Sequence, residues 1–552
     1  MVTETPSHDE AADAFDLVSS PWLPIMDASG RQRMVGLRDV LADAHRIQGL
    51  IERSPLALVA LYRLLLSIVR RTHGPLTGGT WAALWRAGHL DASLLDAYWA
   101  RWTPRLALFD RDYPFMQDPS LGAASSVSVA KLSPDRAAGN NAVLLDHSLD
   151  ATPCGLTPAA AARLMIGHQA FALQGFVSVE PGQDPRLYKS APDGPLIGGL
   201  VVLIQGGNLA RTLLLNLCPV PGRPLAREGS PGDRPTWERE ASAREIDRYP
   251  DGPCDLLTWQ SRRILLRRDA DGLVRRAWIQ RKAAIPRDWD RAAAEPMMPH
   301  VVGAAGAAGL GIRPLRPQPG RALWRDLPTL LSAHEDGRLS TPTLSGVAAE
   351  IDAGVLPSGY LFALRLIALA NRQAAPLYWI DEQVIAPGRM LAEPARAGHL
   401  ALAMGMAELV AGAAVRAARS LAVGLLTSGD RVPPAADVER IVQRLRVAPR
   451  YWERLAPRVA ALQDALAGPV VAGDGGLGAL LEWQRACQVA GSVALSEATA
   501  HLGGAAAARA AAQAALRWRR ELALSFDRLA ATTESGDRAR DVTEAMSEDG
   551  AR

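Results

Sequence analysis

The apolar and polar positions follow two different patterns along this chain, and the change falls near residue 395. Upstream of that point, short apolar runs alternate with turn residues, which is typical of strands and helices mixed in one domain. The segment 21–37, PWLPIMDASGRQRMVGL, predicts two short strands joined by the DASG turn. The segment 256–283, LLTWQSRRILLRRDADGLVRRAWIQRKA, predicts a second strand pair joined at DADG.

Helical spacing marks two segments close to the start of this mixed region. One predicted helix carries Leu37, Val40 and Leu41 on a single face. Ser54 has the side chain of a helix N-cap, and Pro55 suits the first helical position. The segment that follows, PLALVALYRLLLSIVRR, is apolar nearly all round, which predicts a helix in the centre of the core.

An apolar run at 363–384, ALRLIALANRQAAPLYWIDEQV, contains a polar interruption. We interpret it as an apolar helix, an abrupt stop at 371–375 and then an apolar strand. The stop places a long cation, Arg372, and a long amide, Gln373, beside the small Ala374, where most connections use turn residues. This unusual choice makes the tip a candidate functional element.

Downstream of residue 395 the sequence becomes alanine-rich and helical, with expected helices near 395–427, 434–467, 477–502 and 505–533. Long helices with short connections predict an up-down-up-down bundle. The expected fold class is therefore α+β. We predict a large mixed N-terminal domain over 15–394 with long functional loops, followed by an all-α four-helix bundle over 395–533. Residues 1–14 and 534–552 are polar and aperiodic, and we expect disordered tails there.

Composition places the chain among ordinary soluble globular proteins, with 48% hydrophobic and 22% charged residues. The four cysteines lie far apart and without metal-ligand spacing, which favours a reducing cytoplasm over a disulfide framework or a zinc site. Residues 1–15 lack the apolar core of a signal peptide. Charges such as Glu408 and Arg416 interrupt the longest apolar runs, so we expect no membrane span.

The formal net charge of +3 does not by itself indicate binding to nucleic acid. Its make-up is unusual, because only three of the 61 basic residues are lysines, namely Lys131, Lys189 and Lys282. A G+C-rich genome explains the excess of arginine. The positions of the three remaining lysines become informative below.

Catalytic motifs are absent from the sequence. It contains no G-x-S-x-G, no H-E-x-x-H and no P-loop, and no cofactor or metal is expected. One enzymatic alternative stays open, a hydrolase-type site that combines Asp146 and His147 with the Gly206–Gly207 turn. A loop histidine held by a local hydrogen bond and a tight strand–helix turn explain the same residues without catalysis.

The chain nevertheless resembles one family over nearly its whole length between the tails. The similarity rests on the order and completeness of several motifs rather than on any single one. The motifs are FDLVSSPWLPI, YPFMQ, GNNAVLLDHSLD, LTPAAAARLMIGHQAFALQG, SAPDGPL, GGNLARTLLLNL, PTWER, LLTWQSRRI and the 371–375 tip. In this order they resemble CasA, the large subunit of the type I-E CRISPR surveillance complex, Cascade.

This resemblance implies a non-catalytic subunit of an antiviral complex. In such complexes the guide RNA reads the target by base pairing, while protein reads a short adjacent motif in the duplex. The implied roles are reading that motif from the minor groove, opening the duplex to start the R-loop, and helping to recruit a helicase–nuclease. The implied partners are double-stranded DNA, guide RNA, other Cascade subunits and that helicase–nuclease, in the cytoplasm and without a membrane.

The tip residues match the family's DNA wedge. Gln373 corresponds to the glutamine that inserts beside the motif, and Asn371, Arg372 and Ala374 correspond to its neighbours. Small neighbours let backbone approach the base pairs closely. Unstacking a base step costs a few kcal/mol, so wedging is favourable only when backbone contacts and RNA pairing offset that cost.

Two further segments match the family's motif-reading elements. KSAPDGPL resembles its glycine loop, with Gly194 at one glycine position, Ala191 where another glycine is usual, and Lys189 just before. Lys282 is the best match to a minor-groove lysine, with Arg281 as a competitor. Alanine at this position still allows close approach of the backbone.

A third segment, AVLLDHSLDATPCG, resembles the loop that anchors the subunit at the 5′ handle of the guide RNA. Its predicted contact residues are Asn141, Leu144, Leu145, Asp146 and His147. Leu144 stands where an aromatic residue can occur in that loop, and leucine offers no ring for base stacking. The three lysines all fall in or beside segments already assigned to nucleic acid, and a slim ammonium suits a narrow groove. A scaffold that never touches DNA remains a third reading.

Overall fold

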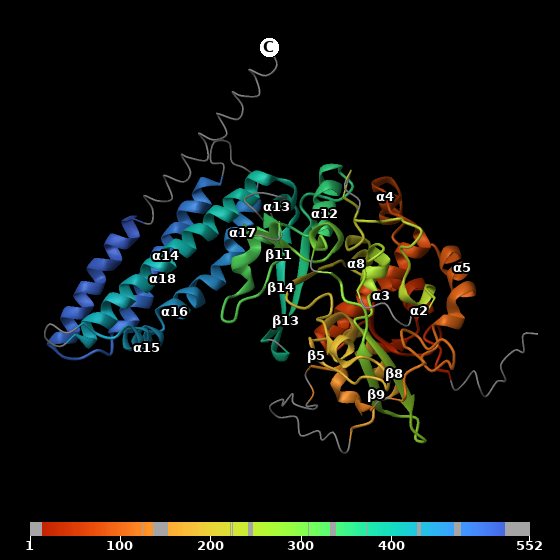
Figure 1. The fold of residues 1–552 in the computed structure, drawn as a ribbon. Coiled ribbons are helices and arrows are strands. Elements are labelled where there is room, and N and C mark those ends of the chain that lie inside the picture. Colours follow the sequence, from red (N-terminus) through yellow and green to blue (C-terminus); the bar gives the residue numbers. More distant parts are fainter. Residues whose placement is uncertain are drawn as a thin grey trace, which may run out of the picture. The chain divides into compact units, whose positions relative to one another are not determined.

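The computed structural model describes most of the chain and groups it into two compact units. The described residues are 14–123, 125–134, 136, 153–220, 222, 225–240, 247–286, 288–306, 309–331, 338–372, 374–427, 432–468 and 476–524. Unit 1 comprises Met1–Leu323 and Thr329–Ala392, and unit 2 comprises Trp324–Pro328 and Glu393–Arg552. Strands and helices mix in unit 1, whereas the described part of unit 2 is helical, in agreement with the predicted α+β class (Figure 1).

Unit 1 contains small sheets rather than one large sheet. Its strands are β1 Leu23–Asp27, β2 Gln32–Val35, β3 Ile47–Leu50, β4 Val127–Ser128, β5 Gly175–Phe176, β6 Ser190–Ala191, β7 Val201–Gln205, β8 Arg262–Arg268, β9 Val274–Arg281, β10 His300–Gly306, β11 Gly309–Pro314, β12 Arg338–Leu339, β13 Leu361–Arg372 and β14 Ala375–Pro387. In the described residues they form the sheets β2-β1-β3, β4-β9-β8, β11-β10-β12, β14-β13-β7 and β5-β6.

Unit 1 also contains helices. They are α2 Leu37–Ala42, α3 Pro55–His73, α4 Gly78–Ala87, α5 Ala92–Trp102, α6 Pro158–Phe171, α7 Pro185–Tyr188, α8 Leu209–Leu215, α9 Pro253–Leu257, α10 Arg291–Ala294, α12 Pro342–Asp352 and α13 Gly388–Ala392. A further short helix, α11 Leu327–Leu331, crosses the division between the units.

Several predicted elements are confirmed where the sequence carries turn or helix-cap residues. The DASG and DADG turns join β1 to β2 and β8 to β9, each as an antiparallel pair. The Ser54 hydroxyl accepts a hydrogen bond from the Ala57 N–H at 3.4 Å at the start of α3. As expected from its apolar circumference, α3 is buried from Pro55 to Arg70 and packs against α6, α9 and β13.

One ion pair lies inside this core. Arg63, in the middle of α3, donates to Glu295 Oε1 at 2.7 Å and Oε2 at 3.1 Å, and to the Leu256 carbonyl at 3.1 Å. Both side chains are 1% exposed. Because a charge removed from water is tolerated only when paired, this contact ties α3 to two segments more than 190 residues later in the chain.

The predicted helix at 363–370 is wrong, because these residues form most of β13. The strand pairs with β14 along its full length and with β7 over Ala363–Ile367, so both backbone edges are hydrogen-bonded. Its side chains alternate between buried and half-buried positions from Phe362 to Leu366, and the next three are all buried. A strand buried on both faces shows a continuous apolar run, which helical spacing also fits.

The Gly206–Gly207 turn between β7 and α8 is packed too closely for a phosphate cradle. A Cβ on Gly206 would lie 2.5 Å from the Arg211 Cβ, so only glycine fits there. The Gly206 N–H donates to Thr212 Oγ1 at 2.9 Å, and the side chain of Asn208 caps α8. A tight strand–helix turn accounts for these residues.

Unit 2 is a helical bundle with a broken second segment. Its helices are α14 Pro394–Leu426, α15 Ala435–Leu445, α16 Val447–Leu455, α17 Val459–Ala467, α18 Leu477–Thr499 and a further helix over 505–524. The predicted continuous helix at 434–467 is therefore wrong. Arg446 adopts a left-handed conformation with φ 49°, and Pro457 lies in a short 3-10 turn between α16 and α17.

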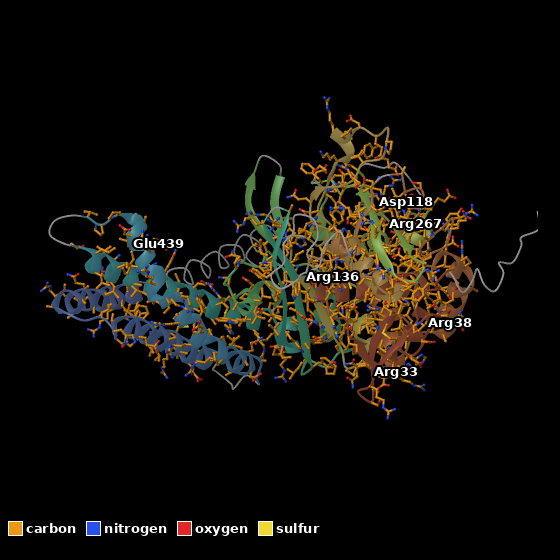
Figure 2. The ribbon with its side chains drawn as sticks, turned by 90° about the horizontal axis from the view of Figure 1, so that it is seen from below. Arg33, Arg38, Asp118, Arg136, Arg267 and Glu439 are labelled. Atoms are coloured by element: carbon orange, nitrogen blue, oxygen red, sulfur yellow. The ribbon has the colours of Figure 1, made fainter. Side chains whose placement is uncertain are left out.

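The helices of unit 2 are joined by buried polar contacts and surface ion pairs. Tyr451 donates to the Ala407 carbonyl at 2.9 Å, and Trp483 donates to the Ala403 carbonyl at 2.8 Å. On the surface, Arg419 of α14 pairs with Glu439 of α15 at 3.3 Å; Figure 2 labels Glu439. By length and composition α14 is apolar enough to cross a membrane. Its buried face packs against α15, α16, α17 and α18.

Because His300 at the start of β10 is buried, we predict that unit 1 loses stability in acid. The side chain is 1% exposed, and burial lowers its pKa from 6.5 to about 4. Between these values the unfolded state binds the proton and the folded state does not, so stability falls as pH falls from 6.5 towards 4. The expected loss is about 1.4 kcal/mol per pH unit.

Urea unfolding of the wild type and of His300→Gln at pH 7 and pH 4.5 measures this effect. The variant should lose less free energy of unfolding between the two pH values than the wild type does. Parallel losses in both proteins would show that His300 is not the titrating group.

Candidate nucleic-acid interface

The hairpin formed by β13 and β14 carries the residues predicted to be a wedge. Arg372 pairs with Ala375 at the last position of the ladder, so only residues 373 and 374 lie between the strands. Arg372 and Ala374 are exposed and Asn371 is half-buried. Gln373 itself lies outside the described residues. The tip is thus a tight hairpin turn and not the connection between a helix and a strand.

A second small sheet lies against this tip. In the β5–β6 pair, Gly175 is opposite Ala191 and Phe176 is opposite Ser190. The position that a Cβ would take on Gly175 lies 4.0 Å from the Ala374 Cβ, which is ordinary van der Waals contact. Figure 1 shows the closed end of the hairpin beside β5. Segments near residues 175, 190 and 374 therefore meet at one place on unit 1.

The predicted motif-reading residues differ in solvent exposure. Lys189 and Ser190 are exposed, whereas Ala191 is only 1% exposed. Gly194 is buried, and a Cβ on it would lie 2.7 Å from the Ala170 carbonyl oxygen, so packing after α6 explains that glycine. Direct contact of DNA with Ala191 or Gly194 is not favoured by this arrangement, because neither position faces the surface.

The neighbouring cations Arg281 and Lys282 lie at the end of β9 and reach different places. Arg281 donates to the Ser190 carbonyl at 3.0 Å and to Asp247 at 3.0 Å, so it holds β6. Lys282 is half-buried and donates to the side-chain oxygen of Gln260. Burial lowers the pKa of Lys282 to about 8, and the nearby Asp118 carboxylate partly opposes that shift.

Lys282 lines an open cleft of about 640 Å³ whose walls combine cations and aromatic rings. The guanidinium of Arg105 lies 3.8 Å from the centre of the Tyr113 ring, and that of Arg248 lies 4.2 Å from the Trp259 ring. Such a wall suits bases and phosphates in principle.

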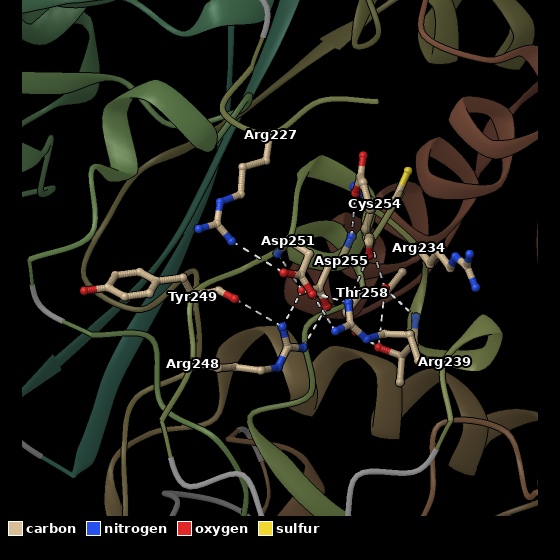
Figure 3. A network of polar contacts seen from close by, with 12 residues as sticks. Arg227, Arg234, Arg239, Arg248, Tyr249, Asp251, Cys254, Asp255 and Thr258 are labelled. Atoms are coloured by element: carbon tan, nitrogen blue, oxygen red, sulfur yellow. Dashed lines mark hydrogen bonds and ion pairs between the residues drawn. The ribbon is translucent and has the colours of Figure 1, made fainter. Parts of the chain in front are cut away.

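Two of the arginines in the cleft wall already form ion pairs with carboxylates, as Figure 3 shows. Arg248 donates to the fully buried Asp255 at 2.8 Å. Arg239 binds Asp251 at 2.6 Å and Asp255 at 3.2 Å. These contacts stabilise α9 and the segment before it, so most of the positive charge in Figure 3 is paired within the fold rather than free for a ligand.

The residues predicted to anchor guide RNA lie outside the described residues. These are Asn141, Leu144, Leu145, Asp146 and His147. The acid–base alternative built on the last two is therefore left untested, and its third component, Gly206, lies in a packed turn. Within the described residues, no group of three or more His, Cys, Asp or Glu side chains is arranged to hold a metal ion.

Sequence reasoning missed two features of this region. Phe176 is 74% exposed, and the Lys189 ammonium lies 5.3 Å from the centre of its ring. Arg281 contacts β6, although Lys282 matched the family pattern better. An isolated aromatic in QGFVSVE gives no pattern that predicts exposure, and the β5–β6 pairing that displays it involves strands of two residues each.

Comparison with known proteins identifies relatives over most of the chain. A family model described as CRISPR-associated protein Cse1 matches residues 16–492. A protein named CRISPR-associated protein CasA/Cse1, from Thermus thermophilus, is 28% identical over 467 residues, which cover 80% of this chain and 86% of that protein.

Solved structures agree in fold. Cse1 from Acidimicrobium ferrooxidans superposes with a TM-score of 0.76 at 27% identity, covering 95% of this chain and 100% of that one. A chain from a structure described as a CRISPR RNA-guided surveillance complex gives a TM-score of 0.72 at 24% identity, covering 93% and 99%.

Proposed function

This chain belongs to the Cse1 (CasA) family of CRISPR-associated proteins, and from that premise we propose that it is the non-catalytic large subunit of a type I-E guide-RNA surveillance complex. In this proposal it acts in the cytoplasm in antiviral defence. It associates with other Cascade subunits and with guide RNA, reads a short motif in duplex DNA, and opens the adjacent base step.

The observation that carries the proposal is the meeting of three segments on unit 1. The tight β13–β14 turn, the β5–β6 pair and the end of β9 lie together, through the Gly175–Ala374 approach and the Arg281–Ser190 hydrogen bond. A narrow, exposed turn is suited to entering a base stack, because it brings little bulk with it. Exposed Arg372 and Lys189 beside it are suited to phosphates.

The minor groove is the expected reading site. Its donor and acceptor pattern is degenerate, which fits a reader that accepts several motif sequences. After opening, pairing between guide RNA and the target strand supplies the sequence specificity. We further propose that the segment around Asn141 to His147 anchors the subunit at the guide RNA, and that the subunit helps to recruit a helicase–nuclease.

Lys282 provides one test of motif reading. Replacement of Lys282 by alanine should weaken binding of the assembled complex to motif-bearing duplex by about tenfold, the size expected for one lost charged contact. Binding to a single-stranded target without the motif should change less. Filter binding of both targets at fixed salt measures the two affinities.

Arg281→Ala is the matched comparison for this test, since that arginine holds β6 directly. Equal losses of affinity for duplex and single strand in Lys282→Ala would show that this residue is only a general phosphate contact.

Assembly itself is tested by purifying the chain with its neighbouring subunits. Co-elution with a small guide RNA supports the subunit role, and a chain that elutes alone would contradict it.

A further inference from the structure

Phe176 is an exposed aromatic side chain on a well-anchored piece of backbone. It is 74% exposed. The N–H of Val177 donates to the Lys189 carbonyl at 2.9 Å, and the N–H of Gln174 donates to Asp193 Oδ1 at 2.7 Å. Hydrogen bonds on both sides of Phe176 therefore fix the strand that bears the ring. A single exposed aromatic is common on protein surfaces, so the case depends on its neighbours.

The first neighbour is a cation. Lys189 lies 5.3 Å from the centre of the Phe176 ring, within the range of a cation–π contact. Within the described part of the chain, Lys189 makes no salt bridge to a carboxylate. Its ammonium is thus available for a phosphate while it covers one part of the ring, and the remaining ring surface stays open.

The second neighbour is the hairpin tip. Gly175 precedes Phe176 in β5, and the position that a Cβ would take on Gly175 lies 4.0 Å from the Ala374 Cβ of the tip. The backbone of β5 therefore runs close to the tip. Any duplex that the tip opens would therefore release its unpaired bases close to Phe176. Target-strand bases then pair with guide RNA, whereas displaced-strand bases have no partner. An aromatic ring beside a cation is the usual platform for such single-stranded bases.

We propose that Phe176 and Lys189 form a stacking platform for an unpaired base of the displaced DNA strand, next to the point of opening. The ring stacks on the base and the ammonium binds the adjoining phosphate. This platform captures the open state after the tip has entered the duplex, so it favours opening without reading sequence. The inference rests on the proposed function of the hairpin tip.

A target that is already unpaired at the step beside the motif tests the platform separately from the wedge. On this target the complex with Phe176→Ala should bind about tenfold more weakly than the wild type, the size of one lost stack. An abasic position in the displaced strand should weaken the wild-type complex equally. Combining the variant with the abasic DNA should add no further loss, because both changes remove the same contact.

Three variants serve as controls. Phe176→Trp keeps an aromatic face and should retain wild-type affinity. Leu94→Ala removes an exposed apolar side chain from α5 and should change nothing. Lys189→Gln should reduce the slope of log affinity against log salt by about one. Additive losses in the cycle, or equal losses with an abasic target strand, would overturn the platform. Because the target is already unpaired, the effect of Phe176→Ala on binding can be interpreted even if the wedge proposal is wrong.

Discussion

A complex carrying Arg372→Ala and Gln373→Ala together should assemble normally and bind duplex target about 10- to 100-fold more weakly than the wild type. Opening one base step costs a few kcal/mol, and a tip without its long side chains offsets less of that cost. The same complex should lose much less affinity for a target pre-opened beside the motif, since that step has already been opened.

Position on the hairpin makes the experiment specific. Arg372 lies at the last rung of the ladder and is exposed, whereas Arg365 lies in the stem and pairs with Asp381 at 2.7 Å. Arg365→Ala removes an equal charge from the same strand without altering the tip. It should leave duplex binding within about twofold, because partly exposed ion pairs contribute little to stability. Equal losses on duplex and pre-opened DNA for the tip variant would argue against a wedge.

The largest effect on stability is expected at the buried ion pair of α3. Arg63→Ala should lower the free energy of unfolding of unit 1 by about 3–5 kcal/mol, because it leaves the Glu295 carboxylate buried without its partner. The Leu256 carbonyl also loses a donor. Urea unfolding followed by circular dichroism measures the loss as a shift of the unit 1 transition.

Two comparisons distinguish this mechanism from a general loss of charge. Arg38→Ala breaks an exposed pair with Asp96 at 3.4 Å and should change stability by less than about 1 kcal/mol. Arg63→Met combined with Glu295→Leu replaces both charges by apolar groups and should recover most of the loss. If the double variant is no more stable than Arg63→Ala, lost packing rather than an unpaired charge explains the effect.

Sequence reasoning succeeded where local chemistry had one structural solution. The DASG and DADG turns, the Ser54–Pro55 cap and the apolar circumference of α3 each specify a local geometry, and each is confirmed. Residues 363–370 were assigned wrongly, because a strand paired on both edges and largely buried shows a nearly continuous apolar run, which helical spacing also fits. Pairing with β7, which is distant in the sequence, favours the strand over the helix.

Sequence reasoning predicted less of the candidate site than of the fold. Resemblance to the family identified the tip as a candidate, and the structure brings Ala374 beside the β5–β6 pair. It does not put Ala191 or Gly194 on the surface, since that exposure depends on packing after α6 and not on residue type. Phe176 was not nominated because a lone aromatic carries no periodicity. The break at Arg446 was also missed, because a left-handed arginine has no sequence signature.

The most direct test of the central claim places a fluorescent base analogue such as 2-aminopurine at the step beside the motif in duplex target. Its fluorescence rises when the base leaves the stack. Guide-RNA complex containing this chain should raise the signal on binding. The Arg372→Ala, Gln373→Ala double variant, or the complex without the chain, should leave it near the level of free duplex. A wild-type complex that binds this duplex with no rise, or a rise that persists with the double variant, would contradict the account.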